Sequence, residues 1–137
     1  MKKITKVVAA ILLIAVMSVT NVTAFAADEG ISPRLSHMSD VSLSFSAVNN
    51  VGHINVGYDG YDSFVRADLN VKIEKRFLLA FWNDVCEWNA SSTEMEEDFY
   101  HACTLDGSGM YRATFTLVIT GNDGTTETVT DVIKSKY

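Results

Sequence analysis

The stretch VRADLNVKIE, residues 65–74, alternates without exception between an apolar side chain and a polar or charged one. Valine, alanine, leucine, valine and isoleucine occupy the odd positions, while arginine, aspartate, asparagine, lysine and glutamate occupy the even ones. A period of two is the signature of a β-strand with one buried and one solvated face. A helical period would scatter the apolar residues around the axis. The stretch therefore predicts a long, half-buried strand.

The same alternation recurs on both sides of this stretch. Residues 41–47, 53–58 and 111–119 alternate in the same way, and the threonine-rich residues 125–133 form the last candidate strand. Turn-forming glycine, asparagine and aspartate lie between them, at residues 49–50, 106–109 and 121–124. About seven short strands with regular turns and no helical period predict an all-β fold of two packed antiparallel sheets. A small closed barrel is the alternative.

The middle of the chain is aromatic and then acidic. Residues 77–88 predict a strand with an irregularity at Asn83 and Asp84, and we expect Trp82 and Trp88 to supply bulky core material. Residues 89–98 are polar and acidic, which predicts an exposed loop or hairpin tip. Residues 99–105 then predict a returning strand, whose register would set Cys103 opposite Cys86.

The N-terminus has the three parts of a secretory signal. Lys2, Lys3 and Lys6 precede an uncharged apolar run over residues 7–16, and Ala24 and Ala26 provide the small side chains of a cleavage site. The apolar run is shorter than the roughly 20 residues of a membrane-spanning helix, so a retained anchor is the less favoured alternative. We expect a signal helix over residues 1–26, cleaved after Ala26. A flexible lead-in over residues 27–40 and one sandwich domain over residues 41–137 would remain, outside the cell.

The charge of the remaining chain predicts which partners it avoids. Without the signal, 8 basic residues stand against 17 acidic ones, a formal net charge of −9. Nucleic acids and anionic membranes attract cationic surfaces. We therefore expect no nucleic-acid partner and no stable membrane insertion of the mature chain.

The two cysteines, Cys86 and Cys103, would both be retained in an oxidising compartment, where paired cysteines usually form a bridge. We expect a disulfide between them. Two buried, reduced thiols are the alternative, because a domain of this length can fold without a covalent link.

The turn before residues 111–119 resembles a tyrosine corner of immunoglobulin-like domains. Gly109 and Tyr111 match that pattern, and Tyr111 is expected in the core. Ala113 occupies the place of the second cysteine of antibody domains, so the resemblance implies that their inter-sheet bridge is absent. The fold that the resemblance implies is an immunoglobulin-like sandwich.

The whole chain also resembles a group of small exported proteins of Gram-positive, clostridial-type bacteria. The shared features are a leader ending in Ala-Phe-Ala, ISPR at residues 31–34, the pattern Trp82, Val85, Trp88, the turn Gly109, Tyr111, Arg112, and the ending Glu127, Thr128, Tyr137. The resemblance implies a secreted immunoglobulin-like sandwich and carries over no catalytic residue.

Candidate chemistry is sparse. His101 and Cys103 could pair an imidazole with a thiolate, but a disulfide beside a surface histidine explains both residues more simply. The acids Glu94, Glu96, Glu97 and Asp98 favour a solvated charge run, with a weak calcium site as the alternative. We therefore expect no catalytic residue, no metal and no cofactor, and do not expect an enzyme.

Three aromatic residues, Tyr58, Tyr61 and Phe64, cluster around the turn at Gly60 and are the candidate binding surface. The competing interpretation is that they cap the open end of the sandwich. The favoured function is a secreted, non-catalytic binding module whose partner is a protein or glycan at the cell envelope or beyond. The alternative is a small antibacterial or toxin-like effector that acts on membranes or competitors.

Overall fold

The computed structural model describes residues 23–24 and 35–137. The predicted signal peptide and most of the predicted lead-in therefore lie outside the described residues. Within the predicted signal peptide, the two-residue strand β1 (Thr23–Ala24) pairs in parallel with the last strand of the chain. Cleavage after Ala26 would remove β1 and leave that last strand at the sheet edge.

Seven longer strands follow, joined by short turns, and the described residues contain no helix. The strands are β2 (Met38–Val48), β3 (Val51–Gly60), β4 (Phe64–Phe77), β5 (Phe81–Ser92), β6 (Glu96–Thr104), β7 (Met110–Gly121) and β8 (Thr126–Lys136). The predicted all-β fold with seven antiparallel strands is confirmed.

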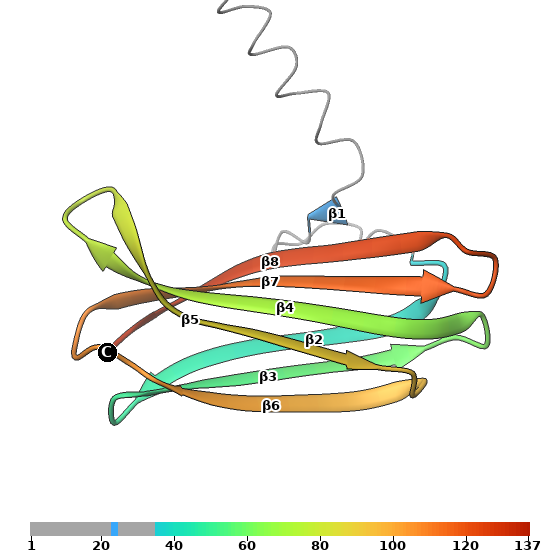
Figure 1. Cartoon of the computed structure of the whole chain (residues 1–137), viewed down its shortest axis with the longest axis horizontal. Helices are drawn as coiled ribbons and strands as arrows, with labels where there is room; N and C mark the ends of the chain where they lie inside the picture. The colour runs from blue at the N-terminus through green and yellow to red at the C-terminus, as the bar shows by residue number, and fades with distance from the viewer. Residues whose placement is uncertain (1–22, 25–34) are drawn as a thin grey trace, which may run out of the picture.

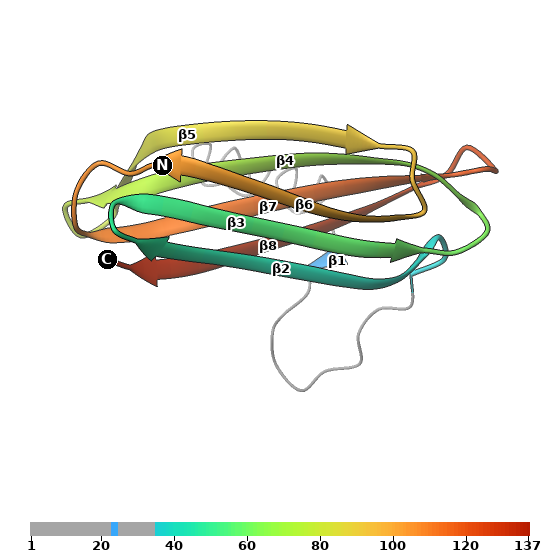
Figure 2. The ribbon, with the colours of Figure 1, turned by 90° about the horizontal axis from the view of Figure 1, so that it is seen from below.

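The strands form two sheets that pack face to face (Figures 1 and 2). One has the order β1-β8-β7-β4-β5 and the other the order β2-β3-β6. The first, second and fifth of the seven long strands thus share one sheet, while the third, sixth and seventh share the other, as in immunoglobulin domains. The fourth long strand, β5, pairs with the third instead of the fifth. The predicted immunoglobulin-like sandwich is therefore the observed architecture.

The core lies between the sheets and is richest along β4 and β7. Every second residue of β7 is buried, from Tyr111 to Gly121, and β4 contributes Ala67, Leu69, Val71 and Ile73 from its odd positions. Ile54 and Val56 face them from β3. The period of two in the sequence thus directs apolar side chains inward on both sheets.

Tyr111 forms the predicted tyrosine corner. Its side chain is fully buried, and its hydroxyl donates a hydrogen bond of 2.5 Å to the Gly107 carbonyl, four residues upstream. Gly107 and Gly109 have positive φ angles of 68° and 153°, which glycine adopts without a steric penalty. The corner fixes the turn that leads from β6 into β7.

The domain begins earlier than predicted. His37 and Met38 are 5% and 1% exposed, and β2 starts at Met38 rather than at Val41. The start at residue 41 is therefore corrected: the alternation begins there, but the chain already packs against the sandwich through two side chains outside that pattern. Similarly, the predicted loop over residues 89–98 is wrong, since β5 and β6 extend into it and leave only residues 93–95 between them.

A β-bulge corrects the prediction for Trp82. Ile73 pairs with Cys86 but Glu74 pairs with Asp84, so Val85 is an extra residue in β5. A one-residue shift reverses which side chains face the core. Cys86 and Trp88 therefore face inward, whereas Trp82 lies on the outer face and is only partly buried. The predicted irregularity at Asn83 and Asp84 lies next to the observed bulge.

The disulfide prediction is confirmed, but not its geometry. Cys86 on β5 is bonded to Cys103 on β6, with their Cα atoms 6.8 Å apart. These strands are edge strands of opposite sheets and are not hydrogen-bonded neighbours. The bridge therefore links the two sheets at one side of the sandwich. Trp88 packs beside it, stacked on His101 at a centroid distance of 4.7 Å.

Candidate functional site

The predicted aromatic binding surface is largely internal. Tyr58 is buried, its ring stacks on Phe64 at 5.3 Å, and its hydroxyl donates a 2.6 Å hydrogen bond to the Glu94 carbonyl. Burial raises the pKa of the Tyr58 phenol. Phe64 packs against the core, and only Tyr61 is well exposed. The prediction is thus wrong for Tyr58 and Phe64, which close the end of the sandwich.

The largest exposed apolar feature lies at the opposite end, in the β4–β5 hairpin. Phe77, Leu78, Leu79 and Phe81 are 53%, 68%, 87% and 64% exposed. We call residues 77–81 the hairpin tip. Apolar residues exposed as one contiguous group mark interaction sites more often than scattered ones do. The hairpin tip is therefore the candidate functional site.

The hairpin tip is exposed because β4 and β5 run past their neighbours. Pairing between β4 and β7 ends at Lys75 and Tyr111, whereas pairing between β4 and β5 continues to Phe77 and Phe81. At about 3.3 Å per residue, the apex projects roughly 10 Å beyond the sheet. Figure 1 shows this hairpin standing clear of the other strands. No other described strand is left to cover either face of it.

The turn has unusual backbone chemistry for such apolar residues. Leu78 has a φ of 55°, a left-handed conformation that favours glycine and asparagine. The Arg76 guanidinium donates hydrogen bonds of 3.2 and 2.7 Å to the Leu79 carbonyl. The apex thus contains a strained Leu78, and the Arg76 side chain satisfies the carbonyl of the next residue, Leu79. Strain of this kind tends to collect at functional positions.

We expect Leu78→Asn to stabilise the fold by about 0.5–1 kcal/mol, because asparagine adopts the left-handed region more readily than leucine. Urea unfolding of the variant and the wild type measures this change. Leu79→Asn, at an apex position without positive φ, is the control and is expected to leave stability within about 0.5 kcal/mol. A loss of stability in Leu78→Asn would contradict the role assigned to its backbone.

Cations surround the base of the hairpin. On the outer face, the Trp82 ring lies 4.3 Å from the Arg112 guanidinium and 6.0 Å from the Lys134 ammonium. Arg112 also donates a 2.6 Å hydrogen bond to Glu74. On the inner side, the Lys75 ammonium donates to the Asp106 carbonyl and lies over the Tyr111 ring. Cations thus lie behind the apolar apex on both faces, and Glu74 and Asp84 pair with two of them, Arg112 and Lys72.

A hollow of about 390 Å³ lies beneath the hairpin, between β4–β5 and the turn after β6. Lys75, Arg76, Asn83 and Asp84 line it from the hairpin, and Thr104 and Asp106 line it from the other side. Its wall is mainly polar and carries two cations, Lys75 and Arg76, and two carboxylates, Asp84 and Asp106.

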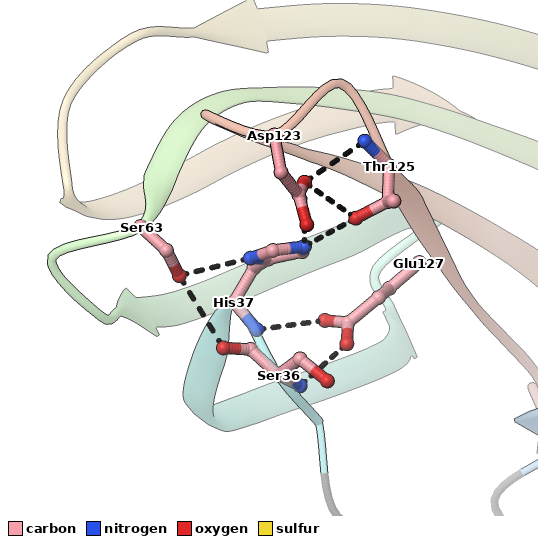
Figure 3. A network of polar contacts seen from close by, with 6 residues as sticks. All are labelled: Ser36, His37, Ser63, Asp123, Thr125 and Glu127. Carbon is pink, nitrogen blue, oxygen red and sulfur yellow. Dashed lines mark hydrogen bonds and ion pairs between the residues drawn. The ribbon is translucent and has the colours of Figure 1, made fainter.

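A polar network at the opposite end holds the N-terminal segment to the sandwich (Figure 3). His37 contacts the Ser63 hydroxyl through Nδ1 at 2.8 Å and the Thr125 hydroxyl through Nε2 at 2.7 Å. Thr125 donates to Asp123 at 2.6 Å, so Nε2 carries a proton and donates to Thr125. Hydrogen bonds from the Thr125 hydroxyl and backbone hold the pKa of Asp123 below its ordinary value. The carboxylate is therefore charged at neutral pH.

This network contains a serine, a histidine and an aspartate (Ser63, His37 and Asp123), but its contacts hold the segment before β2 against the sandwich. We call this network the clamp. Thr125 stands between the imidazole and Asp123, whose carboxylate lies 3.6 Å from Nε2. The Ser63 hydroxyl lies 3.3 Å from the Ser36 carbonyl, and the Glu127 carboxylate accepts from the backbone N–H groups of Ser36 and His37. The contacts of Ser36 and His37 tie the segment before β2 to the β3–β4 turn, the β7–β8 turn and the start of β8. Sequence reasoning missed His37 because it lies outside any alternating pattern.

We expect Gly121→Ala to destabilise the fold by about 1–3 kcal/mol through overpacking, because the new Cβ would overlap the buried His37 ring. The same substitution made in a His37→Ala background should cost less by at least about 1 kcal/mol, since the ring is gone. Thermal or urea unfolding of the four proteins gives the coupling. Equal costs in both backgrounds would contradict the clamp.

The other chemical candidates have no support in the described residues. Cys103 is in the disulfide, so it offers no thiolate to His101. Glu96 and Glu97 lie on β6, and residues 23–24 and 35–137 contain no group of three or more metal-ligand side chains placed to hold an ion. Across the same residues, no helix has the length and apolarity needed to cross a membrane.

Comparison with known proteins yields no family. No family model matches the chain, and no curated protein matches it. Similar solved structures include the CARDB domain of the PF1109 protein from Pyrococcus furiosus, with a TM-score of 0.44 and 15% identity over 81% of this chain and 99% of that one. Spo0M, a sporulation control protein from Bacillus subtilis, has a TM-score of 0.40 and 11% identity over 75% of this chain and 51% of that one. These likenesses carry no argument about function.

Proposed function

We propose that this chain is a secreted, non-catalytic immunoglobulin-like domain that attaches to a surface of the cell envelope through its hairpin tip. The exposed apolar residues 77–81 carry the proposal, because they form a contiguous group and project beyond the sandwich. A bridge between edge strands and a leader-like N-terminus both suit an oxidising compartment outside the cytoplasm. The resemblance to small exported proteins of Gram-positive bacteria supports the same location.

Two substitutions of equal charge separate the hairpin from the rest of the surface. Leu79→Asp places a carboxylate at the apex, while Met95→Asp places one at the opposite end, on a side chain that is 46% exposed. Both lower the net charge by one and remove one exposed apolar side chain. Neither residue belongs to the buried core, so we expect both variants to fold.

We expect the wild type and Met95→Asp to sediment with isolated envelopes, and Leu79→Asp to stay mainly in the supernatant. The full gene is expressed with its own leader, and the mass of the protein in the medium identifies the cleavage site. Retention that is equal in the three proteins, or absent in all of them, would overturn the proposed role of the hairpin. Finding the uncleaved chain only inside cells would overturn secretion.

The second candidate is an effector that damages membranes, and the apolar apex with its cations is the observation that favours it. Dye-loaded vesicles separate the two functions. Release of dye by the purified protein would favour the effector, whereas attachment without release favours the binding domain.

A further inference from the structure

Charge is segregated along the long axis of the sandwich. The pair Val71 and Phe115 divides the described strands into a hairpin half and a distal half. Six of the seven lysine and arginine residues among residues 35–137 lie in the hairpin half, against four acids there. These six cations are Lys72, Lys75, Arg76, Arg112, Lys134 and Lys136. One cation, Arg66, and eleven acids lie at the dividing pair or beyond it.

This segregation changes what the negative net charge implies. A strongly acidic chain is repelled from an anionic surface only where its acids approach that surface. Here the acids lie away from the apolar apex, so the molecule would be oriented with its positive hairpin half toward negative charge. Screening limits interactions over distances beyond about 10 Å at 0.1 M salt, so the near half dominates.

One backbone carbonyl at the apex of the hairpin tip already has a hydrogen-bond partner within the chain. Arg76 satisfies the Leu79 carbonyl at the apex, and Phe77 pairs with Phe81 at the base of the turn. Unsatisfied carbonyls are costly in hydrocarbon. The roughly 10 Å projection also matches the depth of about 5–10 Å to which interfacial elements enter a bilayer.

Trp82 and its cations lie one step behind the apex. Tryptophan is enriched where hydrocarbon meets headgroups, and lysine and arginine extend from there to lipid phosphates. Arg112 and Lys134 flank the indole, while Lys75 and Arg76 line the adjacent hollow. An apolar tip, an interfacial tryptophan and a collar of cations thus follow one another along the hairpin.

A protein partner fits these features less well. Stable protein interfaces bury about 800 Å² on each side, and a narrow convex turn offers less than a flat or concave face does. Lysine is also depleted at such interfaces. A bilayer can instead close around a narrow tip.

We propose that residues 77–81 insert into the surface of an anionic phospholipid bilayer while the surrounding cations contact lipid phosphates. The inference rests on the proposed function and names the partner of the same hairpin. It describes peripheral attachment of a folded sandwich, which differs from insertion of the chain across the membrane.

The test uses vesicles of phosphatidylglycerol and phosphatidylcholine, with pure phosphatidylcholine vesicles as the neutral arm. We expect the processed wild type to partition onto the anionic vesicles at least about tenfold more strongly than onto the neutral ones. Its partition coefficient on the anionic vesicles should fall several-fold when salt rises from about 0.05 to about 0.5 M. The partition coefficient of Leu79→Asp on the anionic vesicles should be at least about tenfold lower than that of the wild type, while Met95→Asp should partition like the wild type. If the leader remains attached, all three proteins carry it, and the comparison still isolates the hairpin.

Fluorescence locates the contact. Trp82 and Trp88 are the only tryptophans in the chain. We expect a blue shift on the anionic vesicles that is lost in Trp82→Phe but kept in Trp88→Phe. A shift that persists in Trp82→Phe would overturn the proposed orientation.

The outcomes distinguish this inference from the function on which it rests. Hairpin-dependent retention on envelopes with no partition onto either kind of vesicle overturns the lipid proposal and leaves the binding function in place. Absence of both overturns the two together. A hairpin-dependent dimer in sedimentation velocity, without vesicle binding, would assign the hairpin tip to a second copy of the chain and overturn the lipid proposal.

Discussion

Phe115→Ala is expected to lower the free energy of unfolding by about 3–5 kcal/mol, the range for emptying a buried phenylalanine site. Phe115 lies at the centre of β7, is fully buried and pairs with the equally buried Val71. β7 is paired with β4 on one side and with β8 on the other, so the strands cannot move into the space that the ring would leave.

Thr116→Ala is the matched control, because Thr116 follows on the same strand but faces outward and is only partly buried. We expect a cost below about 1 kcal/mol for this variant. Urea unfolding curves, fitted with the slope m of free energy against urea concentration, give the change in unfolding free energy for both variants. A cost for Phe115→Ala no larger than that of the control would contradict the placement of the core between the sheets.

Removing the disulfide is expected to cost about 2–4 kcal/mol. Cys86 and Cys103 close a loop with a sequence separation of 17, and they join edge strands that are not paired with each other in either sheet. The bond restricts the unfolded chain, and in the folded protein it holds β5, which carries the hairpin, against the smaller sheet.

The double variant Cys86→Ala, Cys103→Ala measures this effect against the oxidised wild type. Unfolding of the wild type with a reductant present should shift by a similar amount, whereas the double variant should not respond to reductant at all. An unfolding midpoint of the wild type that does not change on reduction would show that the bridge contributes nothing to stability.

These two effects concern the frame that holds the hairpin tip in place. The core sets the distance between the sheets, and the disulfide fixes the edge from which β5 emerges. Loss of either frame element should weaken envelope attachment indirectly. Leu79→Asp should instead weaken attachment at unchanged stability, because Leu79 is 87% exposed.

The candidate site could be predicted from the sequence only in part. The apolar run over residues 77–82 was visible, but an apolar run by itself does not distinguish a core strand from an exposed tip. The prediction therefore placed Trp82 in the core. Two tertiary features decide otherwise: the bulge at Val85 and the end of β4–β7 pairing at Lys75. The sequence indicates an irregularity near the bulge but not which side chains it turns outward, and the end of the β4–β7 pairing has no local signature.

The disulfide and the clamp illustrate the same limit. The sequence predicts a bond between Cys86 and Cys103 across neighbouring strands, whereas the two strands lie in opposite sheets. The sequence places His37 in a flexible lead-in, whereas in the structure it is buried and contacts partners 26 and 88 residues away. Partners so distant in the chain are brought together only by folding.

The sequence by itself determined the inward faces of the alternating strands β4 and β7 and the tyrosine corner. Alternation along residues 65–74 and 111–119 is a local property, because neighbouring side chains of an extended backbone point to opposite faces. Only the tertiary structure decided that no other strand covers the hairpin tip and that lysine and arginine side chains lie next to its base. Both depend on where each strand ends relative to its neighbours, since a side chain is covered only where another strand extends as far.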